Sequence, residues 1–315
     1  RLKVTEDIGR RLVEAIDEFA GTREGFRAAH AKGVCCEGTW TASAAAAKLT
    51  GAPHMQGGQV PALVRFSNAG SDPESADYRA EVFGMAVKFL LPDGRETDIV
   101  ANNLPVFFVR DPEAFLALTK ARRLNPKTRR PAPHRILAFV LTHPESARAI
   151  IYSARHLGTV PASRVETAYN GLHSFRWVDP AGTGRHLRYT LTPEAGVRVI
   201  ARGEARTLGR DYLEQELTER LARGPAGFRL SLQLAAAGDR VNDPTKPWPQ
   251  SRERVDAGRL EIKRLVADPR TDCERRVFDP TRVIDGIECS ADLVLAARRA
   301  AYSVSIERRL AQKAE

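Results

Sequence analysis

Eight short segments between residues 38 and 266 have the character of β-strands, and they constrain the fold more than any other feature of this sequence. Gly, Pro, Asn and Asp punctuate the region, and several segments alternate with period two. The segments are Thr39–Ser43, Ala62–Ser67, Gly84–Leu91, Asp98–Val100, Phe175–Val178, His186–Thr192, Gly227–Leu234 and Arg259–Val266. Eight strands in one region predict a closed antiparallel barrel or a sandwich.

Helical patterns surround and interrupt the strands. An amphipathic run in residues 1–25, with Thr5 as a plausible N-cap, predicts an N-terminal helix. Further helices are expected at Pro112–Ala121, Ala132–His156 and Gly209–Arg223. One long helix is expected at Ser290–Gln312, with Ser290 as its cap and Asp292 nearby. The chain is therefore predicted to be one α+β domain over residues 1–315, with its barrel at 38–266 and a final helix at 290–312.

The charge balance excludes some partners. The 315 residues include 49 Lys and Arg against 39 Asp and Glu, a net charge of +10. The most basic segment, Lys120–Arg135, has seven Lys or Arg residues and no acid, but it has no aromatic residue on which bases could stack. A solvated loop is expected there, with no nucleic acid partner. No apolar run approaches the ~18 residues that a membrane span needs, so no membrane-spanning helix is expected.

The four cysteines do not have the spacing of a zinc site. Cys35 and Cys36 are adjacent, so their Cα atoms lie about 3.8 Å apart, closer than a relaxed disulfide prefers. Together with Cys273 and Cys289 they are expected to be mostly free thiols in a reducing compartment, the cytoplasm. No basic-then-apolar leader follows Arg1, although a removed leader would allow a periplasmic or exported location.

The last expected helix carries a candidate metal ligand. Arg298, Tyr302 and Arg309 project from one helix face at about 100° per residue. Neighbouring guanidiniums favour the phenolate form of tyrosine by lowering its pKa. A phenolate is a hard anionic donor suited to ferric iron. An ordinary tyrosine in an arginine-rich helix is the alternative.

Two further segments could carry chemistry. His30 lies at an element boundary within Arg27–Gly33, and the pKa of histidine suits proton transfer. Asn102 and Asn103 precede Pro105, a pattern typical of a turn. An amide beside the aromatic residues that follow could also donate to a small ligand held over a flat cofactor. The metalloprotease, nucleophile-elbow and nucleotide-binding motifs are absent from the sequence.

Taken together, these motifs resemble those of the haem catalases, and specifically the shorter catalase-related peroxidases. The motifs occur in the catalase order over about residues 25–309. They are RxxHAKG at Arg27–Gly33, VRFS at Val64–Ser67, DIVANNLPVFFVRD at Asp98–Asp111, NGLHSF at Asn170–Phe175, DPTKPW at Asp243–Trp248 and RxxxY at Arg298–Tyr302. The resemblance implies a catalase-like eight-stranded antiparallel β-barrel, peripheral helices, a C-terminal proximal helix and haem b as cofactor.

The resemblance also implies roles for individual residues. His30 and Asn102 match the distal catalytic pair, and Tyr302 matches the axial ligand of the haem iron. The remaining matches surround the cofactor: Arg298 bonds the phenolate, Arg27, Arg65 and Arg309 pair with the haem propionates, Ser67 supports the histidine ring, and Phe107 and Phe115 line the pocket.

The implied function is reduction of hydrogen peroxide or an organic hydroperoxide by a small organic electron donor, in an oxidative stress response. Ala29 stands where the family usually has valine, and Leu104 where it usually has threonine. Only 13 residues follow Tyr302 in this sequence, so the helical C-terminal domain of full-length catalases is expected to be absent. A more accessible haem is therefore expected, with weak or absent catalase activity. A homodimer is a possible assembly.

The sequence leaves four alternatives open. One is a minimal true catalase. Another is a hydroperoxide isomerase like allene oxide synthase, which ranks lower because Ala29 lacks the hydroxyl group found beside the distal histidine in that branch. Non-catalytic haem binding does not need His30 and Asn102 together. A basic nucleic-acid protein ranks last.

Overall fold

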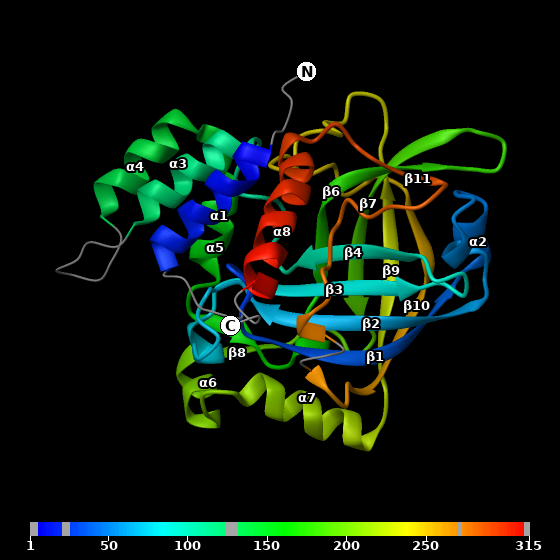
Figure 1. Ribbon diagram of the computed structural model, residues 1–315, viewed down its shortest axis with the longest axis horizontal. Helices are drawn as coiled ribbons and strands as arrows, with labels where there is room; N and C mark the ends of the chain where they lie inside the picture. Colours follow the sequence, from blue (N-terminus) through cyan, green and yellow to red (C-terminus); the bar gives the residue numbers. More distant parts are fainter. Residues whose placement is uncertain (1–5, 21–25, 124–131, 270–272, 312–315) are drawn as a thin grey trace.

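Eight antiparallel strands close into a barrel in the computed structural model, which describes residues 6–20, 26–123, 132–269 and 273–311 (Figure 1). The hydrogen-bonded order is β6-β4-β3-β2-β1-β10-β9-β7, and β7 pairs with β6 again. The barrel strands are β1 Gly33–Ala42, β2 Gln59–Asn68, β3 Phe83–Leu90, β4 Glu96–Asn102, β6 Tyr169–Val178, β7 Gly184–Pro193, β9 Ala226–Leu234 and β10 Arg254–Leu265. The predicted barrel is confirmed, and each predicted segment overlaps one of these strands.

Three short strands were not predicted from the sequence. β11 (Ile287–Cys289) pairs with the second half of β6, and β5 (Thr159–Pro161) pairs with β8 (Val199–Ala201) in a separate two-stranded sheet. Three residues are too few for a period-two pattern to distinguish a strand from a loop.

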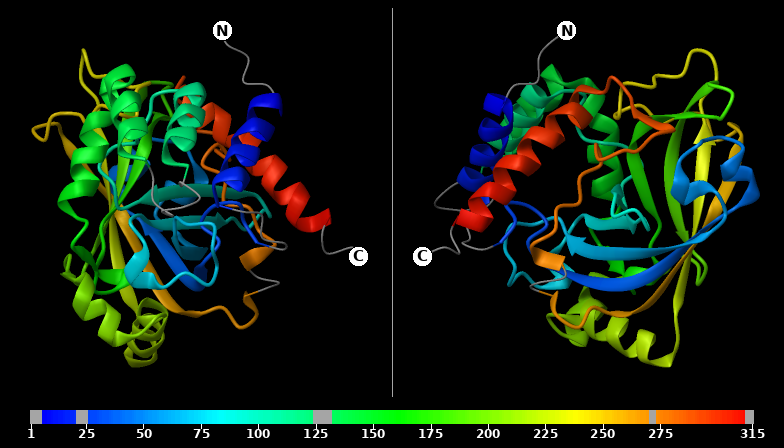
Figure 2. Two further views of the ribbon diagram at one scale, coloured as in Figure 1. Left: turned by 90° about the vertical axis from the view of Figure 1, so that its left-hand side faces the viewer. Right: turned by 45° about the vertical axis from the view of Figure 1, so that its right-hand side comes forward.

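Five helices gather on one side of the barrel, while two others cover its lower end in the view of Figure 1. The first group is α1 Glu6–Ala20, α3 Pro112–Arg122, α4 Pro133–Thr142, α5 Ala147–Arg155 and α8 Leu293–Ala311. The second group is α6 Arg202–Leu208 and α7 Tyr212–Arg223, and a short helix α2 spans Ala44–Ala47. Helices α1 and α8 lie side by side although they come from opposite ends of the chain (Figure 2).

The helix predictions need two corrections. The segment Ala132–His156 is not one helix, because α4 ends before His143 and the chain restarts at Pro144. Proline disfavours helical geometry at the residue before it. The cap of α8 is Asp292 rather than Ser290: Oδ1 of Asp292 accepts from the backbone N–H groups of residues 294 and 295. Thr5 and Gln312, the other expected helix limits, lie outside the described residues.

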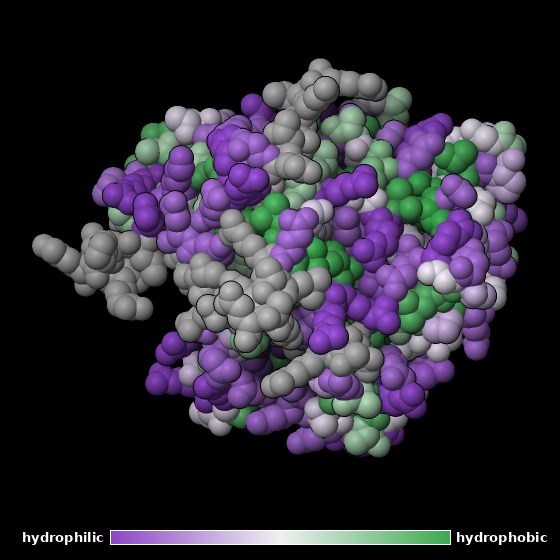
Figure 3. All heavy atoms as spheres, in the orientation of Figure 1, coloured by the Kyte–Doolittle hydropathy of each residue, from purple (hydrophilic) through white to green (hydrophobic). Residues whose placement is uncertain are grey.

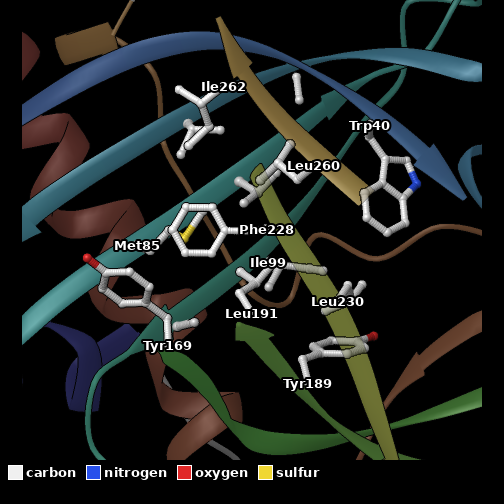
Figure 4. Packing of buried hydrophobic residues seen from close by; sticks show 14 of the residues in the cluster. Trp40, Met85, Ile99, Tyr169, Tyr189, Leu191, Phe228, Leu230, Leu260 and Ile262 are labelled. Atoms are coloured by element: carbon white, nitrogen blue, oxygen red, sulfur yellow. The ribbon is translucent and has the colours of Figure 1, made fainter. Parts of the chain in front are cut away.

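Inward-facing side chains of the barrel strands fill its interior (Figure 4). Phe228, Leu230 and Leu260 are almost completely buried there, together with Trp40 and Met85. Alternate residues of β1 to β4 point outward instead, because side chains alternate along a strand. Outward-facing Cys35, Leu63, Ala86 and Val100 form a second apolar cluster with residues of 266–278.

The cysteine prediction was wrong in part. Cys35 forms a disulfide with Cys273, 238 residues away, while Cys36 and Cys289 are free. Successive side chains of β1 point to opposite faces, so Cys36 enters the core and Cys35 faces the segment that carries Cys273. The adjacency of Cys35 and Cys36 could not reveal that distant neighbour. None of the described helices is both long enough and apolar enough to cross a membrane.

Candidate active site

The imidazole of His30 is held in one position between β2 and β3. His30 is the first residue of the HAKG segment that leads into β1, and it has φ 57°, the only positive value for a non-glycine residue in the described ranges. Its Nδ1 lies 2.9 Å from Oγ of Ser67 in β2. A Cβ atom on Gly84 of β3 would lie 2.9 Å from Cε1 of His30, so only glycine leaves room for the ring. A backbone conformation this rare is typical of functional sites.

His30 is neutral over most of the pH range. Burial, followed by the positive charges of Arg65, Arg298 and Arg27, lowers the pKa of His30 to about 3. Three arginines that lie far apart in the sequence therefore act on one ring. Since Nδ1 faces Ser67, Nε2 is the nitrogen left to accept a proton from a ligand.

For the reaction with peroxide that the sequence resemblance implies, this pKa predicts a flat pH profile. A histidine whose pKa is lowered to about 3 remains a competent base at every pH above about 4, so the second-order rate constant should be constant from pH 5 to 9. Stopped-flow measurements over that range test this expectation, with circular dichroism at each pH as the control for folding. A tenfold fall per pH unit below about 6.5 would show an unperturbed histidine instead.

Asn102 is the last residue of β4 and lies close to the ring of His30. It is the strand partner of Gly84, the residue against which His30 lies. Its Oδ1 accepts a hydrogen bond of 2.9 Å from the N–H of Leu104, which orients the amide. The Nδ2 donor of Asn102 has no partner among the described residues. Asn103 instead closes the turn, since its Oδ1 accepts from the N–H of Phe83.

Tyr302 lies at the end of a chain of polar groups that leads through Arg298 to buried His173 and Asp292. Arg298 donates to Oη of Tyr302 from Nη2 at 2.7 Å and from Nε at 3.2 Å. Its Nη1 lies 3.1 Å from Nε2 of His173, whose Nδ1 lies 2.6 Å from Oδ2 of Asp292. The expected shared face of Arg298 and Tyr302 is confirmed. Nothing is described of the side chain of Arg309.

His173 and Asp292 were not identified as site residues from the sequence. Burial lowers the pKa of His173 in spite of Asp292, so the ring is neutral: Nδ1 donates to Asp292 and Nε2 accepts from Arg298. Asp292 has two functions, because its Oδ1 caps α8 while its Oδ2 orients His173. The NGLHSF motif was the one sequence indication of His173.

Removing Asp292 is expected to destabilise the fold. Asp292→Ala loses both the helix cap and the partner of a buried histidine, which should lower the free energy of unfolding by about 2–4 kcal/mol. Asp292→Asn keeps an acceptor for the cap and should lose less. Urea denaturation measures both values. The matched control is Asp285→Ala, because Asp285 is 98% exposed and makes only a long ion pair with Arg95. Equal losses for Asp292 and Asp285 would contradict the expectation.

Arg27 and Arg65 come together around one carboxylate. Nη1 of Arg27 lies 2.5 Å from Glu274 Oε2, and Nε of Arg65 lies 3.2 Å from Glu274 Oε1. Burial, together with the charge of Arg27, lowers the pKa of Arg65 to about 9. Two guanidiniums around a single carboxylate leave one positive charge in excess, which suits a further anion.

The aromatic residues lie on the α8 side of the site. Phe107 stacks with Phe115 at 6.3 Å between ring centroids and lies 6.0 Å from the ring of His173. Leu104 is buried, and Ala29 is partly exposed. Hydrophobic side chains are visible beside α8 on the otherwise mainly hydrophilic face of Figure 3. A surface hollow of about 350 Å³ on β1 and β10 shares no residue with this site.

The residues present fit a haem. Within the described ranges, no group of three or more His, Cys, Asp or Glu side chains could hold a metal ion. The site instead offers one tyrosine oxygen that two arginine N–H groups stabilise, a separate neutral imidazole, and an arginine pair with excess positive charge. That donor set suits an iron whose other ligands come from a flat, anionic macrocycle.

Comparisons with known proteins agree with this geometry. The catalase family model matches residues 4–315. The chain is 40% identical over 297 residues to a catalase-related peroxidase of Mycolicibacterium paratuberculosis, covering 94% of this chain and 93% of that protein. It is 31% identical over 298 residues to a catalase-related peroxidase of Synechococcus elongatus, with coverages of 95% and 87%. The structure matches catalase A from Saccharomyces cerevisiae with a TM-score of 0.81 and 26% identity, covering 95% of this chain and 64% of that one.

Proposed function

Because this chain belongs to the catalase family and is an oxidoreductase that acts on peroxide, we propose that it is a haem b peroxidase. Its proposed substrates are hydrogen peroxide or an organic hydroperoxide, and a small organic molecule is the proposed electron donor. The observation that carries the proposal is that the hydroxyl oxygen of Tyr302 lies 2.7 Å from Arg298, at the end of a chain of hydrogen-bonded polar groups. A tyrosine oxygen toward which two N–H groups of one guanidinium point is a hard donor suited to ferric iron.

In this proposal Tyr302 holds the haem iron, and Arg27, Arg65 and Arg309 bind the propionates. The bound haem would supply the redox chemistry that no side chain can perform. Arg298 stabilises the negative charge of the Tyr302 oxygen, and His173 and Asp292 keep Arg298 in place. Phe107 and Phe115 contribute apolar walls on that side of the site.

On the other side of the site, His30 and Asn102 act on peroxide. Nε2 of His30 accepts a proton from one peroxide oxygen and returns it to the other, so that this second oxygen can leave as water. The two electrons that break the O–O bond, and the acceptor of the remaining oxygen, would come from the bound haem. Ser67 keeps the ring in the orientation that this transfer needs. The Nδ2 group of Asn102 donates a hydrogen bond to peroxide and stabilises the charge that develops on the departing oxygen.

The absorption spectrum of the purified protein tests the cofactor. High-spin ferric haem with tyrosinate ligation is expected, and the pyridine haemochrome should identify haem b. A folded, colourless protein that does not take up added haem would overturn the proposal.

A true catalase is the second candidate, because the structural match to catalase A is strong. We favour the peroxidase since both compared relatives of similar length are named catalase-related peroxidases. Small Ala29 beside His30 would also leave more room for organic donors. Dioxygen release and oxidation of an aromatic donor, measured on one preparation at equal peroxide, separate the two. Rapid dioxygen release with negligible donor oxidation would establish the catalase.

Three further expectations are part of this proposal. The chain is expected to act as one haem domain over residues 1–315, and a homodimer is its possible assembly. A cytoplasmic location was expected from free thiols, but the disulfide between Cys35 and Cys273 favours the exported alternative, since disulfides persist mainly in oxidising compartments. Cell fractionation tests the location.

A further inference from the structure

Residues 273–282, here called the strap, cross the outer face of the barrel. The disulfide between Cys273 and Cys35 ties one end of the strap to β1. At the other end, the N–H of Asp279 donates to Oδ2 of Asp98 at 2.9 Å, and the carbonyl of Arg282 accepts from the N–H of Asp98 at 3.2 Å. Between the two ends, Phe278 packs in a small apolar cluster that includes Cys35. The strap is therefore attached along its length.

Glu274 is the strap residue that reaches the arginine pair. Each of its carboxylate oxygens bonds a different guanidinium, one of Arg27 and one of Arg65. Backbone carbonyls complete the orientation: Arg27 donates from Nη2 to residues 273 and 276 of the strap, and Arg65 donates from Nη2 to Ala31. Nε of Arg27 and Nη1 of Arg65 have no partner among the described residues. Hydrogen bonds therefore orient both guanidiniums, and each keeps an N–H group that no described residue accepts.

Charge explains why the pair needs Glu274. Arg65 is 4% exposed and lies close enough to Arg27 for the two positive charges to repel each other. Burial by itself would raise the pKa of Glu274, but Arg65 and Arg27 outweigh burial and hold the pKa below its usual range. Glu274 is therefore a carboxylate, and without it two like charges would face each other in a poorly hydrated place.

We propose that Glu274 is a positioning residue for the two guanidiniums that receive the haem propionates, and that the Cys35–Cys273 disulfide keeps its carboxylate in place. This inference rests on the proposed function, because it takes haem as the ligand. Glu274 acts through Arg27 and Arg65, and the disulfide acts through Glu274.

The test compares two porphyrins on the same haem-free protein. Ferric protoporphyrin IX has free propionates, whereas its dimethyl ester has the same ring without their charges. Absorbance titrations should show that Glu274→Gln weakens protoporphyrin binding about tenfold and dimethyl ester binding less than about twofold. Glu274→Asp keeps the charge and should recover part of the loss. Equal weakening for both porphyrins, or no weakening, would overturn the role of Glu274.

The chain offers a matched control for this variant. Glu166 also bridges two arginines, with Arg198 at 2.9 Å and Arg220 at 2.8 Å, and none of these residues belongs to the candidate site. Glu166→Gln should leave both affinities unchanged. Wild-type protein that binds neither porphyrin would overturn the proposed function itself, so the two failures are distinguishable.

The disulfide is tested in the same assay. The double variant Cys35→Ala, Cys273→Ala should weaken binding of protoporphyrin selectively, while Cys289→Ala, which removes an exposed free thiol, should not. Adding Glu274→Gln to the double variant should cause no further loss, because both changes remove one interaction. Fully additive losses would overturn the link between the disulfide and Glu274. If the double variant does not fold, wild type with its disulfide reduced, verified by thiol labelling, provides the same comparison.

Discussion

Replacing Tyr302 with phenylalanine is expected to weaken haem binding by at least about 100-fold while leaving the protein folded. The change removes one oxygen atom, the one that Arg298 holds at 2.7 Å. The aromatic ring remains, so packing in α8 should be little affected. Absorbance titration of the haem-free variant measures the affinity, and any residual complex should lack the tyrosinate spectrum.

The control for Tyr302 is Tyr152→Phe. That hydroxyl makes one long hydrogen bond of 3.4 Å to the carbonyl of Asn103, so its loss should change neither the affinity nor the spectrum. An unchanged spectrum for Tyr302→Phe would show that another group binds the iron. The assignment of α8 as the proximal helix would then be wrong.

The second large effect is expected at His30 and Asn102, on the side of the site opposite Tyr302. His30→Ala should slow the reaction with peroxide by about 1,000-fold or more and leave haem bound, because it removes the base and keeps the proximal ligand. Asn102→Ala should slow it less, by about 10–1,000-fold, since an orienting donor is lost while the base remains. Stopped-flow rates on haem-loaded variants measure both effects.

The relative size of the two losses decides the assignment. A larger loss for Asn102→Ala than for His30→Ala would mean that the acid–base residue has been misidentified. The control is His156→Ala, because His156 stacks on Tyr152 in the peripheral helices and contacts no residue of the site. Its rate should equal that of the wild type.

Local patterns in the sequence were sufficient for the barrel and for parts of the site. Period-two alternation in several segments, with Gly, Pro, Asn and Asp between the segments, identified the eight barrel strands, because burial on one face leaves a repeat that can be read from neighbouring residues. The spacing of Arg298 and Tyr302 likewise predicted their contact, since residues four apart lie on one helix face. The helix break before Pro144 and the cap at Asp292 depend on local chemistry too, but one unbroken helix was predicted across Pro144, and Ser290 was predicted as the cap.

Only the tertiary structure decided which distant residues meet. No periodicity connects His173 with Arg298, Glu274 with Arg65, or Cys35 with Cys273, because these pairs are 125, 209 and 238 residues apart in the chain. These contacts form because the strap and α8, which follow the last barrel strand in the sequence, pack against residues that come much earlier in the chain. The low pKa of His30 has the same origin: it requires burial and three arginines from different segments at once. Local sequence therefore determined the helices and strands, whereas contacts between distant segments determined the charges around His30.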